Sequence, residues 1–285
     1  MIQAGIYHRL TVSRISNHGL YLADDEGAEV LLPNRYVSLA NKVGDVFDVF
    51  VYHDSEDRLV ATTERPHAAI GEVACLRAVG RNDHGAFLDW GLSAKDLFVP
   101  HRKQTLPMEL GRSYVVYLYR DEVTGRAVAT ARLNEVLSNV EIALQPRQEV
   151  EILVAAESSV GFRVVVNNRH WGVIYRNQLF RPVAVGDRMK AYVRRITEDN
   201  RIDVSLQQEG FDEVKKAAST LLELICKANG TLAVGDESKP EAVSAAVGMS
   251  KKVFKRALGN LLKQGFVTAE PERITLTERG KNSKQ

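Results

Sequence analysis

Hydrophobic and polar side chains alternate along short segments in the first two thirds of the chain. Residues 47–52 (Phe-Asp-Val-Phe-Val-Tyr) and 189–194 (Met-Lys-Ala-Tyr-Val-Arg) show this period of two, which is typical of strands with one buried face. Turn-forming clusters such as Asn17-His-Gly19 and Asn82-Asp-His-Gly85 interrupt the alternation. The pattern therefore predicts many short strands joined by tight turns.

A three-fold repeat organises these predicted strands. Each repeat has a glycine, a second landmark 14 or 15 residues later, another glycine 11 residues after that, and then a basic residue before a β-rich segment. The landmarks are Gly19, Pro33 and Gly44; Gly85, Pro100 and Gly111; and Gly161, Tyr175 and Gly186. Several short strands in about 65 residues predict a small closed barrel of the five-stranded OB type, because closure removes the edges of the sheet.

The period changes after residue 210. Apolar residues between Phe211 and Ile225 fall at helical spacing, and Asn229-Gly230 is a typical helix end. Ser238 and Ser250 are candidate N-caps for two further helices, which would end at Gly248 and Gly265. Two strands around Glu270-Pro-Glu272 complete the layout of a winged helix.

We therefore predict a multidomain, mainly β chain: three tandem five-stranded OB-type barrels followed by an α+β winged-helix domain. The expected domains are residues 1–67, 68–140, 141–210 and 211–285. A connector at 66–70 would join the first two barrels, and a short helix within 133–147 would join the second and third.

Composition supports a folded protein, with 45% hydrophobic and 26% charged residues in a chain of 285. Its apolar runs are too short to span a bilayer, and residues 1–10 show no apolar core of the kind that a signal peptide has. Cys75 and Cys226 are two thiols far apart in the sequence, which does not suggest a disulfide framework or a metal site. We expect a cytoplasmic protein without a membrane partner.

Motifs of catalysis are missing from the sequence. It has no phosphate-cradling GxxxxGK[ST], no nucleophile elbow and no HExxH, and its seven histidines are scattered. We expect a protein that is not an enzyme, with no catalytic residue, no metal site and no cofactor.

The segment Gly85-Ala-Phe-Leu-Asp-Trp-Gly91 resembles the GAFVD segment of the S1-type RNA-binding domain. The wider pattern, from about Gly5 to Gly280, resembles the conserved virulence factor B (CvfB) family. Supporting segments are 95–100 (Lys-Asp-Leu-Phe-Val-Pro), 239–241 (Lys-Pro-Glu) and 248–257 (Gly-Met-Ser-Lys-Lys-Val-Phe-Lys-Arg-Ala). This resemblance implies an RNA-binding regulator built from S1-type barrels and a winged helix.

Two aromatic residues are candidates for stacking on bases. On either side of Tyr21 and Phe87 stand aliphatic residues that prefer the barrel core, so both rings should face outward, where a ring can stack on a base. The alternative is packing against a neighbouring domain. His18 and His84 directly precede the landmark glycines and could stack or contact phosphate, or simply be solvated.

Arginines form the second candidate set. Arg58 with Asp54, and Arg126 with Asp121, match acidic and basic positions of the S1 pattern, although a salt-bridged hairpin is an equal alternative. The S1 pattern commonly has histidine where this chain has Pro33, Pro100 and Tyr175. Repeat three also lacks the outward aromatic, and could bind electrostatically. Its candidates are Arg163, Tyr175, Arg176 and Arg201, while Trp171 could either stack or close the barrel.

Charge is uneven along the chain. Residues 1–67 carry a net charge of −4 and residues 211–285 carry +4, so phosphate neutralisation favours the later domains over the first barrel. We expect the third helix after residue 210 to contact nucleic acid through four basic residues, and Arg273 to lie near the wing. The alternative is that these residues form only a solvated face of the helix. The four are Lys251, Lys252, Lys255 and Arg256.

Three functions remain open from the sequence. The first is a regulator that holds single-stranded RNA by stacking and electrostatics. The second is a DNA-binding transcription regulator that contacts duplex nucleic acid through the winged helix. The third is an adaptor that contacts the ribosome or the polymerase, with the acidic first barrel as a protein-binding surface.

Overall fold

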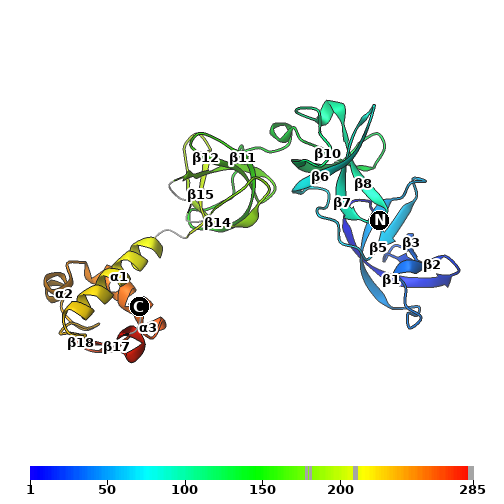
Figure 1. Ribbon diagram of the computed structural model, residues 1–285. Coiled ribbons are helices and arrows are strands. Elements are labelled where there is room, and N and C mark those ends of the chain that lie inside the picture. The colour runs from blue at the N-terminus through cyan, green and yellow to red at the C-terminus, as the bar shows by residue number, and fades with distance from the viewer. Residues whose placement is uncertain (177–178, 180–181, 208–210, 282–285) are drawn as a thin grey trace. The chain divides into compact units, whose positions relative to one another are not determined.

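The chain divides into two compact units, Met1–Leu206 and Gln207–Gln285. The computed structural model describes residues 1–176, 179, 182–207 and 211–281. The first unit holds three closed barrels and the second a helical domain with a small sheet (Figure 1).

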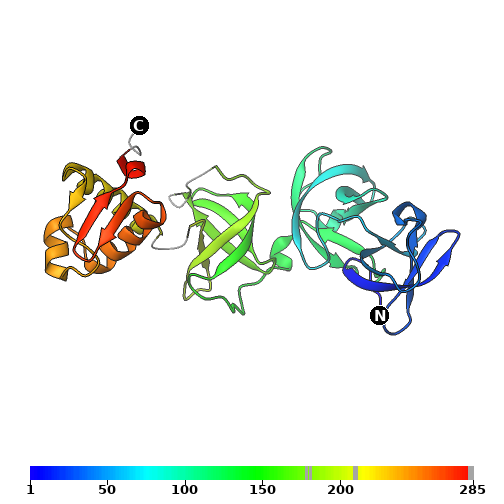
Figure 2. The same ribbon diagram turned by 90° about the horizontal axis from the view of Figure 1, so that it is seen from below.

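Each barrel has five strands in the same order around its circumference: first, second, third, fifth and fourth. This confirms the predicted fold class, and Figure 2 shows the strands of each barrel from a second side. Barrel 1 contains β1 (Tyr7–Ser16), β2 (Gly19–Ala23), β3 (Glu29–Pro33), β4 (Val46–His53) and β5 (Leu59–Thr62). Barrel 2 contains β6 (Val73–Asn82), β7 (Gly85–Leu92), β8 (Lys95–Pro100), β9 (Ser113–Arg120) and β10 (Ala127–Thr130). Barrel 3 contains β11 (Glu149–Glu157), β12 (Gly161–Val166), β13 (His170–Tyr175), β14 (Arg188–Ile196) and β15 (Ile202–Ser205).

The first two landmarks of each repeat are partners across the second and third strands. The pairs are Gly19 with Pro33, Gly85 with Pro100 and Gly161 with Tyr175. A Cβ atom on any of the three glycines would lie 2.0–2.2 Å from a backbone carbonyl oxygen of the neighbouring strand. Only glycine permits this close approach, and the approach explains the constant register of the repeat.

The barrel cores continue across the junctions between barrels. Phe50 of barrel 1 meets Trp90 of barrel 2 edge to face, with ring centroids 5.4 Å apart. The Trp90 indole N–H donates to the carbonyl of Ala68 in the connector at 2.7 Å. Between barrels 2 and 3, the junction is a cluster of Val73, Leu133, Leu137, Leu153 and Val165.

The linker helix predicted within residues 133–147 is wrong. Only a 3₁₀ turn, Leu133–Glu135, forms there. Leu133 and Leu137 are drawn into the junction cluster, and the Asn139 side chain donates to the backbone carbonyls of Trp171 and Asn200. These tertiary contacts compete with a short and isolated helix, which is marginal in water.

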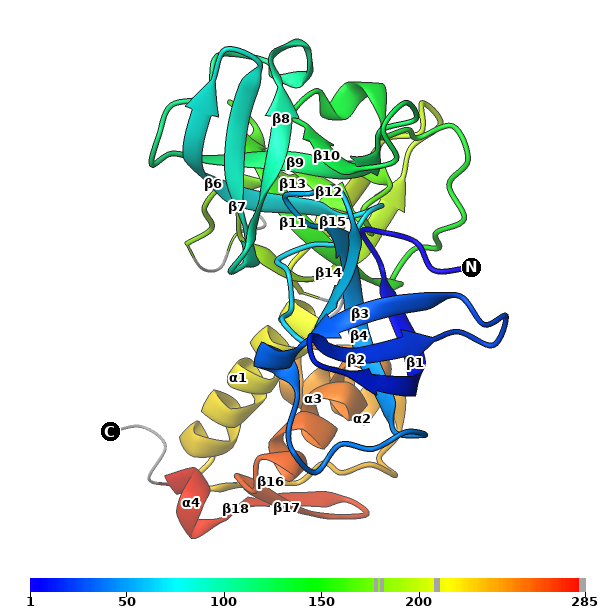
Figure 3. The same ribbon diagram turned by 90° about the vertical axis from the view of Figure 1, so that its right-hand side faces the viewer.

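The second unit is a winged helix, as predicted (Figure 3). A three-stranded sheet in the order β16-β18-β17 accompanies three main helices, of which α1 and α3 pack together. The elements are α1 (Phe211–Lys227), β16 (Thr231–Leu232), α2 (Pro240–Val247), α3 (Lys251–Lys263), β17 (Val267–Glu270), β18 (Arg273–Leu276) and α4 (Glu278–Lys281). The sequence analysis found neither the short β16 nor α4.

The two predicted serine caps differ in outcome. Ser250 caps α3, and its hydroxyl accepts from the N–H of Val253. The cap predicted at Ser238 is wrong, because α2 begins after Lys239 and makes no side-chain cap. The Ser238 hydroxyl instead accepts from the N–H of Gly235 at 2.8 Å, which stabilises the turn before the helix.

Candidate nucleic-acid interface

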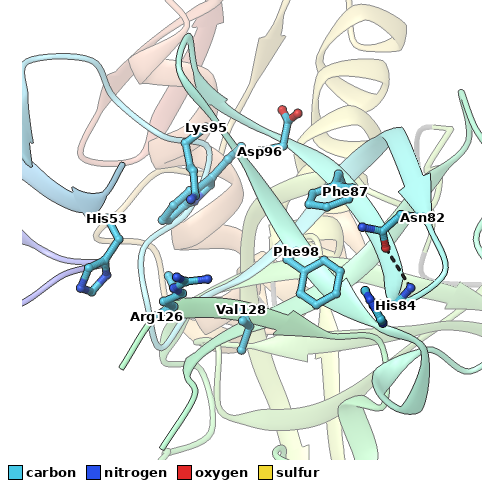
Figure 4. A pocket seen from close by; sticks show the side chains of 11 residues that line it. His53, Asn82, His84, Phe87, Lys95, Asp96, Phe98, Arg126 and Val128 are labelled. Atoms are coloured by element: carbon cyan, nitrogen blue, oxygen red, sulfur yellow. Dashed lines mark hydrogen bonds between the residues drawn. The ribbon is translucent and has the colours of Figure 1, made fainter. Parts of the chain in front are cut away.

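A groove of about 380 Å³ on barrel 2 gathers three of the predicted site residues, His84, Phe87 and Arg126 (Figure 4). It runs from the β6–β7 turn, across β7 and β8, to the end of β4 in barrel 1. Other side chains that line it include His53, Asn82, Lys95, Asp96 and Phe98. The groove therefore combines aromatic and cationic groups with one acidic side chain, Asp96.

Two phenylalanines form the floor of the groove. Phe87 on β7 and Phe98 on β8 are cross-strand partners, and their ring centroids lie 5.2 Å apart with the planes tilted by 42°. Both are half-buried, whereas their neighbours Ala86, Leu88 and Leu97 lie in the core. Phe87 thus faces away from the core as the alternation predicts, and a second ring lies beside it.

The end of the groove at the β6–β7 turn is polar. The Asn82 side-chain oxygen accepts from the backbone N–H groups of His84 and Gly85, at 2.9 and 3.1 Å. These bonds fix the turn and leave the His84 imidazole exposed at the rim.

The opposite end of the groove is cationic. Lys95 and Arg126 come from barrel 2, and His53 comes from barrel 1. Burial, followed by repulsion from Arg126, lowers the pKa of Lys95. Burial also lowers the pKa of His53, which favours its neutral form.

The two predicted acid–base pairs have different outcomes. Arg58 contacts Asp54 at 2.8 Å, so this hairpin pair forms. Asp121 instead accepts hydrogen bonds from Thr124 in its own turn. Arg126 pairs across the barrel junction with Asp57 at 2.7 Å, because the β4–β5 turn of barrel 1 reaches the groove.

In barrel 1 the candidate stacking ring is already covered. The guanidinium carbon of Arg14 lies 3.4 Å from the centroid of the Tyr21 ring, and Glu29 holds Arg14 by an ion pair at 2.8 Å. His18 is exposed in the β1–β2 turn. A base could reach the covered side of Tyr21 only by displacing Arg14.

In barrel 3 an arginine covers the tryptophan in the same way. Arg163 lies over the Trp171 ring at 3.5 Å and donates to the side chain of Asn134 at 2.8 Å. Burial lowers the pKa of this guanidinium. Trp171 therefore packs under Arg163 and lines a hollow of about 350 Å³, which Arg201 also lines.

The other candidates of barrel 3 are tied to acids. The fully buried Asp203 accepts from Arg195 at 2.6 Å and from the Tyr175 hydroxyl at 3.4 Å, and Arg201 lies 3.8 Å away. Arg176 pairs with Glu157 at 2.8 Å. The structure thus places Tyr175 and Arg201 around one carboxylate and Arg176 around another.

The basic residues of the winged helix lie on α3. Lys252, Lys255 and Arg256 are exposed and Lys251 is half-buried, while Phe254, Ala257, Leu258 and Leu261 fill the core. Lys255 contacts Asp236 at 3.1 Å. Arg273 is exposed on β18, opposite Glu270 of β17.

Phe98, Lys95 and His53 are among the groove residues that sequence reasoning missed. Phe98 stands between the buried Leu97 and Val99, so the alternation that identified Phe87 also identifies Phe98. Lys95 has no comparable signal. His53 belongs to another barrel, and only the packing of the two barrels brings it to the groove.

The part of the chain that the structure describes lacks two kinds of feature. Among those residues there is no group of three or more His, Cys, Asp or Glu side chains that could hold a metal ion. None of the described helices is both long and apolar enough to cross a membrane.

Comparison with known proteins identifies the domains at both ends of the chain. Residues 4–64 match the S1 domain family, and residues 219–276 match the CvfB-like winged helix domain. S1 and winged helix domains are nucleic-acid-binding domains, and this chain is accordingly a nucleic-acid-binding protein.

Several known proteins align with most of the chain. YitL of Bacillus subtilis is 26% identical, over 92% of this chain and 89% of its own length. Conserved virulence factor B of Staphylococcus saprophyticus is 22% identical, over 91% of this chain and 89% of its own length. A crystal structure of a multidomain protein with nucleic acid binding domains from Streptococcus pneumoniae is 22% identical and covers 96% of this chain and 98% of its own, with a TM-score of 0.40. With an S1 domain match at its start, a CvfB-like winged helix match at its end and conserved virulence factor B proteins among its relatives, the chain is similar to the CvfB proteins over about nine tenths of its length.

Proposed function

We propose that this protein binds single-stranded RNA in the groove of barrel 2 and regulates gene expression in the bacterial cytoplasm through that binding, without catalysis. The observation that carries the proposal is the Phe87–Phe98 pair beside Lys95 and Arg126. Aromatic rings stack on unpaired bases, and cations next to them neutralise the phosphates of the same strand.

The proposal favours a single strand over a duplex because stacking on a side chain needs a base that is splayed out of its helix. The two rings lie in a groove on the barrel surface, which a flexible strand can enter. Barrel 2 provides the main stacking site, since Arg14 covers Tyr21 in barrel 1 and Arg163 covers Trp171 in barrel 3. The latter two barrels contribute further contacts from their arginines.

Fluorescence anisotropy on the full chain tests this proposal. A labelled single-stranded RNA of about 20 nucleotides and a DNA duplex of the same length are titrated across a salt series. We expect the RNA to bind more tightly and to keep part of its affinity at high salt, because stacking does not depend on counterion release. Tighter binding of the duplex, or no binding of RNA, would overturn the proposal.

A second candidate function is binding of duplex nucleic acid by the winged helix. The exposed basic residues of α3 favour it, since this element enters the groove of a duplex in helix-turn-helix proteins. Charge reversal by Lys252→Glu and Arg256→Glu should abolish duplex binding and leave most of the single-stranded RNA affinity. Equal loss of both affinities would place the two ligands on one surface and refute the division of roles.

A further inference from the structure

One turn of barrel 1 reaches into the cationic end of the groove. This turn lies between β4 and β5 and supplies a partner to both barrel 2 cations. The Asp57 carboxylate contacts the Arg126 Nε at 2.7 Å, and the backbone carbonyl of Asp54 accepts from the Lys95 Nζ at 3.3 Å. Barrel 1 therefore places acceptor oxygens on the two groups that could grip a phosphate.

The turn is held in this position by its own hydrogen bonds. The Asp54 side chain accepts from the N–H groups of Glu56 and Arg58 at 2.9 and 3.0 Å, and it also pairs with the Arg58 guanidinium. Asp57 adopts a left-handed backbone conformation with φ of 66°. Asp and Asn tolerate this conformation better than other residues with side chains, so an Asp57→Asn change removes the charge and keeps the turn.

The site has the chemistry of an anion pocket. Lys95 and Arg126 lie at one end of the same groove, and Arg126 contributes to the lowered pKa of Lys95. Two cations that repel one another favour an anion between them. Figure 4 shows Phe98 between these two cations and His84, so an anion held by the cations can belong to the nucleotide whose base stacks on the ring.

We propose that Lys95 and Arg126 form a phosphate subsite of the groove, and that the Asp57 carboxylate of barrel 1 occupies this subsite until a phosphate of the bound strand displaces it. This inference rests on the proposed binding of RNA in the groove. It gives acidic barrel 1 a role as an internal competitor: the barrel lowers the affinity for RNA and rejects ligands that cannot both stack and replace the carboxylate.

The test is a double-mutant cycle in the full chain. Affinity for a labelled single-stranded RNA is measured for the parent protein, Asp57→Asn, Arg126→Gln and the double variant. Asp57→Asn should tighten binding about two- to fivefold, the range that an exposed ion pair contributes. In the Arg126→Gln background the gain from the same change should be smaller, because Asp57 then has no guanidinium to pair with and acts on Lys95 alone.

A matched control separates this local competition from the general charge of barrel 1. Asp48 lies on β4, is exposed and is outside the lining of the groove. Asp48→Asn removes the same charge and should leave the affinity unchanged. Two RNAs of the same sequence, one with a 5′-hydroxyl and one with a 5′-phosphate, identify the phosphate that displaces Asp57. If it is a terminal phosphate, Asp57→Asn tightens binding of the 5′-phosphorylated RNA alone. If it is an internal phosphodiester, Asp57→Asn tightens binding of both RNAs.

The outcomes separate this inference from the proposed function. If RNA binds and Phe98→Ala weakens binding, but Asp57→Asn does not tighten it, the phosphate subsite is refuted and the stacking groove remains. An equal gain from Asp48→Asn, or an undiminished gain in Arg126→Gln, would also overturn it. If the parent protein does not bind RNA, both proposals fall.

Discussion

Removing the aromatic floor of the groove is the most informative single perturbation. We consider Phe87→Ala, Phe98→Ala and the double variant. The rings are in contact, with centroids 5.2 Å apart, so they form one platform. Stacking contributes about 1–3 kcal/mol per base when it is removed by alanine substitution. One base on this platform then corresponds to a Kd that rises about 5- to 150-fold in the double variant.

The contact between the rings also predicts how the single variants combine. Each single substitution removes one side of a shared platform, so the two losses should not add, and the double variant should bind only slightly more weakly than the worse single variant. Fluorescence anisotropy with single-stranded RNA measures the affinities, and thermal unfolding verifies that the half-buried positions have been changed without loss of the fold. The slope of log Kd against log salt should stay constant, because no phosphate contact is lost.

Leu31→Ala is the matched control for this experiment. Leu31 pairs with Tyr21 in barrel 1, as Phe98 pairs with Phe87 in barrel 2, and it lies outside the groove. We expect its affinity for RNA to remain within about twofold of the parent, which is below the smallest stacking contribution. An unchanged Kd in the double phenylalanine variant, or an equal loss in Leu31→Ala, would refute the assignment of stacking to barrel 2.

Two further predictions concern stability. Gly161→Ala places a Cβ atom 2.0 Å from the carbonyl oxygen of Ile174, whereas the Cβ of Gly27→Ala meets nothing within 4 Å. In chemical denaturation, Gly161→Ala should therefore lower the free energy of unfolding by about 1–3 kcal/mol more than Gly27→Ala does. Equal losses would contradict the close-approach explanation of the repeat. The pKa of His53 is lowered by burial from its ordinary value of 6.5, so the unfolded state binds the proton more readily. The free energy of unfolding should therefore fall as the pH drops through about 6.5 towards the lowered pKa, and His53→Gln should flatten that part of the profile. An unchanged profile would argue against a half-buried neutral imidazole.

Much of the fold could be predicted because each barrel repeats the same local constraints. The close approach at Gly19, Gly85 and Gly161 demands glycine, and period-two alternation assigns each strand residue to the core or the surface. These constraints act within a few residues or between neighbouring strands, so they leave a direct trace in the sequence. The same rule also identifies Phe98 once it is applied to β8.

One landmark of the repeat is hidden because its residue type differs. Gly5 and Gly71 precede the landmark glycines of repeats one and two by 14 residues and have positive φ. In repeat three this position is Arg147, with φ of 71°, and its N–H donates to the carbonyl of Val193. The same backbone hydrogen bond forms at this position in all three barrels. In repeat three an arginine adopts the positive φ that glycine adopts without strain.

The rest of the site could not be predicted because it depends on how the barrels pack. Arg126 pairs with Asp57 rather than with Asp121, and His53 lines a groove of another barrel. No spacing in the sequence relates residues of separate barrels to one another. For the same reason, the segment after Leu133 follows its contacts with barrel 3 instead of forming a helix.

The most direct measurement is photo-crosslinking of the full chain to a single-stranded RNA, followed by mass spectrometry of the crosslinked peptides. A base that stacks on the groove floor lies in van der Waals contact with a phenylalanine ring, so the account predicts crosslinks in the peptides that contain Phe87 or Phe98. Crosslinks confined to α3 of the winged helix, or to barrel 1, would contradict the claim that the groove of barrel 2 holds the strand.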